Sequence, residues 1–242
     1  MNPERRQVLG WGAAAAVTAV APGLSLIELA RARSPAEAAS ALQRWGLLID
    51  INKCGECNDC VTACHEENGV GPQAGGRPET DAQWIRKLTL RDKHTKHVQT
   101  LPMMCQHCED PPCVDVCPTG ASFKREDGIV LVDKHTCIGC RYCVMACPYG
   151  ARSFIHEAVS GQKADVPRGK GTVESCTLCV HRVDRGETPA CVEACNHSGG
   201  KAMAFGDLND PAADIHRRLR TEPSSQVRAD LALNTAVRYQ GL

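Results

Sequence analysis

The residues best suited to chemistry in this sequence are its 16 cysteines, which fall into four groups of four. Two groups have the spacing C-x2-C-x2-C-x3-C, and one of them continues into a proline. In iron–sulfur proteins such a run supplies three ligands to one cluster and its fourth cysteine to the other cluster of a pair. The groups are Cys54, Cys57, Cys60 and Cys64; Cys105, Cys108, Cys113 and Cys117; Cys137, Cys140, Cys143 and Cys147; and Cys176, Cys179, Cys191 and Cys195. Four groups predict four [4Fe–4S] clusters and a chain that conducts electrons.

Zinc and disulfides are the two other common uses of cysteine. Structural zinc sites take two C-x2-C pairs separated by a longer stretch, whereas here three cysteines share one tight loop. Cysteines two residues apart in a triple run cannot all pair with one another, and 16 cysteines are too dense for a disulfide framework in 242 residues. A structural zinc protein remains an alternative that metal analysis would settle.

Six histidines lie near the cysteine groups: His65, His107, His135, His156, His181 and His197. Because 16 cysteines already satisfy four clusters, we expect these histidines to face solvent or to support the ligands. The sequence shows no Gly-rich phosphate loop, Ser/His/Asp set or paired carboxylates. No catalytic residue is therefore predicted.

The formal net charge is zero, from 28 basic and 28 acidic residues. Sixteen thiolates around four cores of about 2+ would add about −8 to this balance. Four basic residues beside the cysteines could offset part of that charge, or could be ordinary solvated charges: Lys53, Lys134, Arg141 and Arg152. No basic run interleaves with aromatic residues, so nucleic-acid binding is not predicted.

The first 32 residues have the features of a signal peptide. Arg5 and Arg6 stand side by side, Val8–Ile27 carries no charge, and Ala30-Arg31-Ala32 offers an A-x-A cleavage site. The arginine pair resembles the twin-arginine type, without the strongest flanking residues. Because clusters are assembled in the cytosol, export of a folded protein to the periplasm is expected. A general secretory signal and an uncleaved anchor remain alternatives.

The cysteine groups repeat along the chain. A shift of 83 positions carries the first group onto the third, and Pro111–Cys117 parallels Pro189–Cys195. The predicted fold class is α+β, a duplicated bacterial-ferredoxin-like fold with short strands and helices around the clusters. A hairpin is expected over 84–101, surface loop over 157–174 and a helix from Asp210. The expected segments are a signal peptide at 1–32, a linker at 33–46, the duplicated domain at 47–206 with insertions at 66–104 and 157–174, and a C-terminal helix and docking arm at 207–242.

The order of the groups, the stretch Cys105–Pro118 and the stretch Thr188–Cys195 resemble the four-cluster electron-transfer subunits of the dimethyl sulfoxide reductase superfamily. The signal and the segment Phe205–Pro211 are similar to the exported branch. Residues 164–176 resemble the periplasmic, DsrO-like subunit of the membrane complex linked to dissimilatory sulfite reductase.

The resemblance implies crossed ligation, in which each fourth cysteine serves a cluster begun by another group. The implied sets are Cys54, Cys57, Cys60 with Cys195; Cys176, Cys179, Cys191 with Cys64; Cys105, Cys108, Cys113 with Cys147; and Cys137, Cys140, Cys143 with Cys117. His65 and Asn196 follow Cys64 and Cys195 where proline follows the other two fourth cysteines.

The resemblance also implies a non-catalytic relay, attached to the membrane through its partners. These are an integral-membrane quinone-handling subunit and a multihaem c-type cytochrome or a molybdenum catalytic subunit. The alternatives are a free periplasmic polyferredoxin and the beta subunit of a molybdenum reductase acting on tetrathionate, polysulfide or nitrite.

Overall fold

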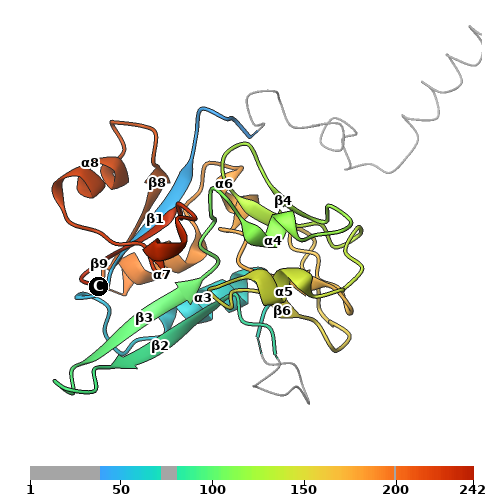
Figure 1. Cartoon of the computed structure of the whole chain (residues 1–242), viewed down its shortest axis with the longest axis horizontal. Helices are drawn as coiled ribbons and strands as arrows, with labels where there is room; N and C mark the ends of the chain where they lie inside the picture. Colours follow the sequence, from blue (N-terminus) through green and yellow to red (C-terminus); the bar gives the residue numbers. More distant parts are fainter. Residues whose placement is uncertain (1–38, 72–80, 199) are drawn as a thin grey trace, which may run out of the picture. The chain divides into compact units, whose positions relative to one another are not determined.

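A computed structural model describes residues 39–71, 81–198 and 200–242 (Figure 1). The signal peptide predicted at 1–32 and the first part of the linker predicted at 33–46 lie outside the described residues. Chain contacts separate Met1–Ala38 from Ala39–Leu242, and the architecture below is that of the second unit.

A three-stranded sheet lies at the centre of the core. Strand β1 (Trp45–Asp50) is its middle strand, paired antiparallel with β8 (Met203–Asp207) and parallel with β9 (Val237–Gln240). The apolar run Leu47-Leu48-Ile49 is at most 1% exposed, as expected for a strand covered on both faces. Helix α8 (Asp214–Thr221) packs on this sheet and inserts Ile215, which is fully buried.

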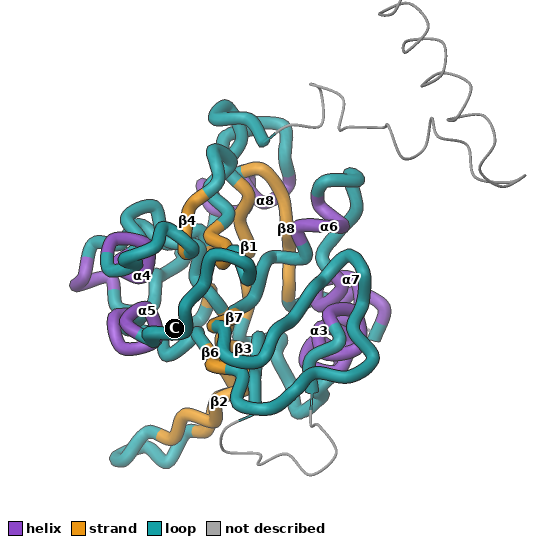
Figure 2. Tube along the Cα trace, turned by 90° about the vertical axis from the view of Figure 1, so that its right-hand side faces the viewer, coloured by secondary structure: helices purple, strands orange, loops and turns teal. Residues whose placement is uncertain are grey.

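Short helices follow the cysteine loops and pack in two pairs. Helix α3 (Asp59–Asn68) lies against α7 (Ala190–His197), and α4 (Pro112–Asp115) lies against α5 (Tyr142–Ala146), as Figure 2 shows. Proline at the first helical position starts α4, where a missing N–H costs nothing. The two pairs join the first cysteine group to the fourth and the second group to the third.

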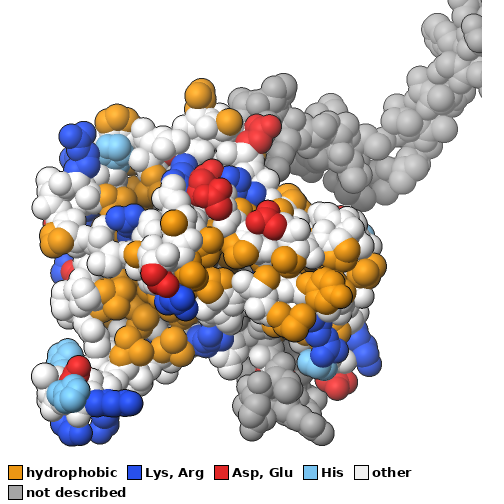
Figure 3. Space-filling model, in the orientation of Figure 1, with side chains coloured by type: hydrophobic (Ala, Val, Ile, Leu, Met, Phe, Trp, Pro, Cys, Tyr) orange, Lys and Arg blue, Asp and Glu red, His pale blue; other side chains and the backbone are white. Residues whose placement is uncertain are grey.

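The hairpin predicted over 84–101 is present. Its strands are β2 (Ile85–Arg91) and β3 (Val98–Met104), paired antiparallel from Ile85 with Met104 to Arg91 with Val98. The base is buried in the core, whereas the exposed tip gathers Lys, Arg and His side chains (Figure 3). The hairpin therefore packs into the core at one end only.

Two smaller ribbons flank the second and third cysteine groups. Strand β4 (Ser122–Lys124) pairs with β5 (Val130–Val132) across a turn in which the Gly128 N–H donates to the Arg125 carbonyl at 3.0 Å. Strand β6 (Ser153–Phe154) pairs with β7 (Val173–Glu174), which lies inside the segment expected to be surface loop. That expectation is wrong at its end, because Val173 and Glu174 are at most 1% exposed. Glu174 is buried because it forms an ion pair with Arg168 at 2.7 Å.

The C-terminal segment differs most from the expectation. The helix begins at Asp214, after the Asp210-Pro211 signal, and a 3-10 turn η2 (Ala229–Leu231) follows. The expected docking arm is wrong for its last part, because Val237–Gln240 forms strand β9 of the central sheet. Tyr239 is fully buried and its hydroxyl donates to the carbonyl of Pro102 at 3.0 Å.

Across the three described ranges, the helices are all too short or too polar to span a membrane. The mixture of short helices with one three-stranded and three two-stranded sheets is consistent with the predicted α+β class.

Candidate iron–sulfur centres

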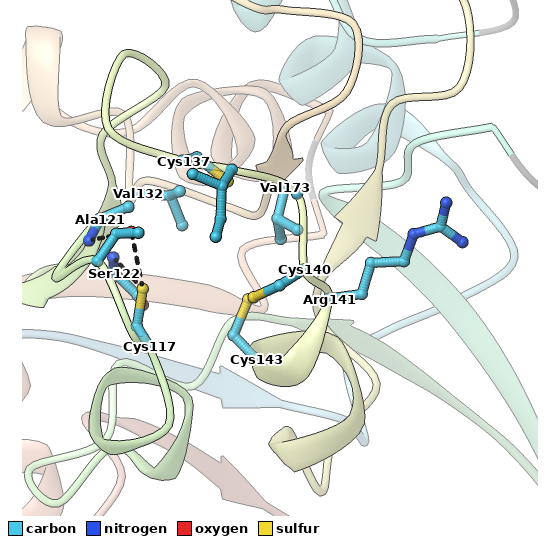
Figure 4. A pocket seen from close by; sticks show the side chains of 12 residues that line it. Cys117, Ala121, Ser122, Val132, Cys137, Cys140, Arg141, Cys143 and Val173 are labelled. Carbon is cyan, nitrogen blue, oxygen red and sulfur yellow. Dashed lines mark hydrogen bonds between the residues drawn. The ribbon is translucent and has the colours of Figure 1, made fainter.

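Four clusters of cysteine side chains form in the interior, numbered here as sites 1 to 4. Site 4 is the best seen, in a cavity drawn in Figure 4, where the cysteine side chains surround one space. Its cysteines are Cys117, Cys137, Cys140 and Cys143. Three come from the third group and its helix α5, and Cys117 lies two residues after the end of α4. Apolar side chains such as Val132 and Val173 complete the wall.

Sites 2 and 3 are also cavities lined by four cysteines. Site 3 is lined by Cys105, Cys108, Cys113 and Cys147. Site 2 is lined by Cys64, Cys176, Cys179 and Cys191. In each cavity three cysteines come from one group and the fourth comes from the last position of another group.

Site 1 is recognised from the electrostatic neighbours of Cys60. Its thiol is influenced by those of Cys54, Cys195 and Cys57, which form site 1 with it. The fourth member again comes from a distant group, because α7 carries Cys195 to the side of α3. The packing of α3 on α7 and of α4 on α5 is therefore what exchanges the fourth cysteines.

Burial disfavours free thiolates at these sites. It raises the pKa of Cys60, Cys105 and Cys108 to about 12, with neighbouring thiols adding to the effect at Cys60 and Cys108. Four buried thiols that share one space deprotonate readily only when they bind a cation, which supplies the missing positive charge. All 16 cysteines are free of disulfides and available for this.

The geometry suits a cluster better than a single ion. Within the ranges 39–71, 81–198 and 200–242, no three His, Cys, Asp or Glu side chains converge closely enough to hold one metal ion. The four thiols of sites 2, 3 and 4 instead line a common cavity from different elements, as the iron corners of a cube require. The donor set therefore fits four [4Fe–4S] clusters, one for each site.

Polar groups donate to several of the sulfurs. The backbone N–H of Ser122 donates to Cys117 Sγ at 3.4 Å, and that of Leu178 donates to Cys176 Sγ at 3.4 Å. At Cys117 these donors outweigh burial, so its pKa is lowered. Hydrogen bonds to cluster sulfurs and ligands are one of the means by which proteins set reduction potential.

The loops that carry the ligands have unusual backbone angles. Leu178 and Cys179 have φ of 56° and 49°, in the left-handed region that side chains rarely adopt. Gly139 has φ of 71°, and a Cβ there would overlap the carbonyl oxygen of Gly171. Glycine is therefore required beside Cys140 for the chain to turn so closely.

The four basic residues noted beside the cysteines have different surroundings. Lys53 is exposed and forms an ion pair with the buried Asp50 at 3.0 Å, and Arg141 lies over the ring of Phe154 at 3.9 Å. Lys134 is half-buried and donates to the carbonyl of Val173 at 2.6 Å. Arg152 is only 5% exposed, so it is not a solvated charge.

Sequence reasoning missed other side chains that contact the sites. Asn68 donates its amide to Cys64 Sγ at 3.7 Å and to Cys179 Sγ at 3.8 Å. Thr100 on the hairpin donates to the carbonyl of Cys54 at 2.9 Å. Neither residue belongs to a cysteine motif, and only the packing of distant segments reveals them.

The histidines are placed by other contacts. His107 is buried, accepts a hydrogen bond from the Val130 N–H at 3.1 Å, and has its pKa lowered by burial to about 3. His181 lies 2.7 Å from a carboxylate oxygen of Glu67. These contacts give both residues a structural role in the described chain.

The four sites form a series. Thiols of successive sites lie close enough to influence each other's ionisation: Cys60 acts on Cys191, Cys105 on Cys176, and Cys143 on Cys113. The series therefore runs from site 1 through sites 2 and 3 to site 4. The two exposed cysteines, Cys57 and Cys140, belong to the two ends.

Comparison with known proteins gives the same cofactor. Two models of the 4Fe–4S dicluster domain match residues 53–121 and 96–208, which together contain all 16 cysteines. The Hdr-like menaquinol oxidoreductase iron–sulfur subunit 1 of Archaeoglobus fulgidus is 41% identical over 270 residues, covering 100% of this chain and 99% of the relative. A tetrathionate reductase subunit of Salmonella typhimurium is 39% identical, covering 82% and 72%. A sulfite dehydrogenase subunit of Allochromatium vinosum is 37% identical, covering 82% and 83%.

Proposed function

Because this chain belongs to the family of 4Fe–4S dicluster iron–sulfur electron-transfer subunits, we propose that it is the periplasm-facing relay of a membrane-attached oxidoreductase complex. The relay passes single electrons along sites 1 to 4 and has no catalytic centre of its own. Each cluster supplies the one-electron chemistry. The protein supplies the thiolates, excludes water from the interior and sets the spacing of the series.

The observation that carries this proposal is the convergence of cysteines from different groups. We assign the ligands of the four clusters to sites 1 to 4, so that every fourth cysteine crosses to another group. Cys117 in the cavity of Cys137, Cys140 and Cys143 supports the crossing, as does Cys64 in the cavity of site 2. Such crossing binds two segments of the chain to each cluster, so that cluster binding and folding are coupled.

The exposed cysteines support an electron path that reaches the surface at site 1 and at site 4. Cys57 at site 1 and Cys140 at site 4 reach the surface, whereas Cys60 and Cys143 of the same sites are buried. A partner can therefore approach either end of the series within a short distance of a cluster. We propose that one end serves a quinone-handling membrane subunit and the other a redox partner, either a multihaem cytochrome c or a molybdenum subunit.

The Archaeoglobus relative, named as a subunit of a menaquinol oxidoreductase, supports the membrane complex, because the match covers 100% of this chain. It favours a subunit of a menaquinol-oxidising complex over the beta subunit of a molybdenum reductase. The tetrathionate reductase relative supports that second role, with a match to 82% of the chain. A free periplasmic polyferredoxin remains the third possibility.

The test is purification of the complex from detergent-solubilised membranes with a tag at the C-terminus. We expect a brown complex that contains close to 16 iron and 16 sulfide per copy of this chain, since each of four cubes holds four of each. A quinone-handling membrane subunit should be captured with it. Recovery of the chain alone from the soluble periplasm would favour the free carrier, and stoichiometric zinc without sulfide would exclude the relay.

A further inference from the structure

Arg152 is the one basic side chain near the sites that is both buried and without a carboxylate partner in the described part of the chain. It follows the third cysteine group, is 5% exposed, and lines the cavity of site 3. None of its three guanidinium nitrogens has an oxygen or nitrogen acceptor among the described residues. An unpaired buried guanidinium is costly, so some other negative charge must stabilise it.

The groups that act on Arg152 are cysteine sulfurs of two different sites. Cys113 and Cys105 belong to site 3, and Cys143 belongs to site 4. Arginine stays protonated in proteins. A permanent positive charge therefore lies between sites 3 and 4.

The other charged groups on this side of the core do not cancel that charge. Arg168 is buried with Glu174 in a pair at 2.7 Å, so these two neutralise each other. Lys134 lies close to Glu174 and Cys137 and donates to a backbone carbonyl. In the described ranges no ion pair links Arg152 to Glu174 or to any other carboxylate.

Sites 1 and 2 have a different arrangement. The position that matches Arg152 in the 83-residue repeat is Gly69, which has no side chain. Its neighbour Asn68 presents a neutral amide to Cys64 Sγ at 3.7 Å. Cations also act on sites 1 and 2, but they are placed differently from Arg152. Lys87 near site 1 is half-buried and donates to the carbonyls of Gly55 and Cys57. Arg182 near site 2 is paired with Glu67 and Glu193. Neither is a buried cation without a carboxylate or carbonyl partner, as Arg152 is.

We propose that Arg152 is a fixed positive charge that raises the reduction potentials of the clusters in sites 3 and 4, and makes this pair the higher-potential half of the relay. Reduction adds one electron, and hence one negative charge, to a cluster core. A cation beside it stabilises the reduced form more than the oxidised form, and burial strengthens this effect because the surroundings screen charge poorly. This inference rests on the proposed assignment of clusters to the four sites.

The experiment is a redox titration of the intact complex, followed by the electron paramagnetic resonance signal of each cluster. Signals of the end sites are assigned with Cys57→Ser and Cys140→Ser. In Arg152→Gln the reduction equilibrium constants of the clusters in sites 3 and 4 should fall at least tenfold. This corresponds to a fall of 59 mV in the reduction potential of a one-electron couple. Sites 1 and 2 should change by much less. Arg152→Lys should restore most of the loss, and Arg217→Gln, an exposed arginine on α8, is the surface-charge control.

Unchanged potentials in an Arg152→Gln complex with full iron content would overturn the inference and leave the relay intact. Equal falls at all four clusters would also overturn it, since they would show a general loosening. If Arg152→Gln loses its iron, the order in which the clusters of the parent complex are reduced tests the inference. Sites 3 and 4 must then be reduced before sites 1 and 2, and the reverse order contradicts the proposal. Absence of clusters from the parent would instead contradict the proposed function.

Discussion

The thiol of Cys195 lies close enough to that of Cys60 to raise its pKa, although 135 positions separate the two residues in the sequence. Helices α3 and α7 carry these cysteines and pack together, and the same packing places Cys64 in the cavity of Cys176 and Cys191. The two helices thus exchange their last cysteines. Under the proposed ligation, a cluster at site 1 would connect segments 135 positions apart.

This exchange makes Cys195→Ser informative. The variant should lose or convert the cluster of site 1, begun by Cys54, while site 2 keeps its fourth ligand Cys64. Iron content should fall by about four per chain. Cys64→Ser is the matched variant and should damage site 2 in place of site 1. Loss of the Cys176 cluster in Cys195→Ser would contradict the crossing, as measured by iron analysis and paramagnetic resonance.

Gly139→Ala tests the tight loop at site 4. The new Cβ would overlap the Gly171 carbonyl and would also occupy a left-handed conformation. Left-handed backbone alone costs about 1–2 kcal/mol for a residue with a side chain. Gly186→Ala is the control, because it has φ of 77° and nothing within 4 Å of the new atom. We expect both variants to lose stability in thermal unfolding, but only Gly139→Ala to lose the site 4 cluster. Equal behaviour of the two would show that the overlap is unimportant.

Tyr239→Phe tests the burial of strand β9. The hydroxyl donates to the Pro102 carbonyl at 3.0 Å and accepts from Gln106 at 3.2 Å. Its loss should cost about 1 kcal/mol in the free energy of unfolding at pH 8. The measurement is chemical denaturation, with Tyr142→Phe on an exposed ring as the control. No loss of stability would mean that the C-terminal strand is not part of the folded core.

The pH dependence of the same variant has a defined sign. Burial raises the pKa of Tyr239 in the folded chain, although the hydrogen bond from Gln106 opposes this. An unfolded tyrosine ionises near pH 10. Above that pH the unfolded chain has released a proton that the folded chain retains, so the parent loses stability as pH rises. The difference between parent and Tyr239→Phe should therefore shrink above about pH 10, and a constant difference would contradict the buried hydroxyl.

Export is tested by replacing Arg5 and Arg6 with lysine. A twin-arginine receptor reads the pair itself and not only its charge. We expect the variant precursor to remain in the cytosol with its clusters assembled, as judged by cell fractionation and absorbance. Export equal to that of the parent would indicate a general secretory signal.

The cysteine spacing by itself determined the cofactor, because the ligand loops are local and three cysteines within seven residues restrict what can bind. The residues of the segment 84–101 likewise predicted the β2–β3 hairpin, because a hairpin is formed by neighbouring residues of the sequence. The resemblance implied which fourth cysteine serves which group. No local signal in the residues does so, because that choice depends on segments that are separate in the sequence, by as many as 135 positions between Cys60 and Cys195.

Only the tertiary structure decided the rest. Strand β9 looks polar and peripheral in the sequence, yet Tyr239 is buried because a parallel partner is available on β1. Arg152 is indistinguishable from a surface arginine in the sequence, and becomes a buried charge only when sulfurs of two sites surround it. Burial and charge balance depend on what the whole chain brings together. They cannot be read from the residues on either side of a position.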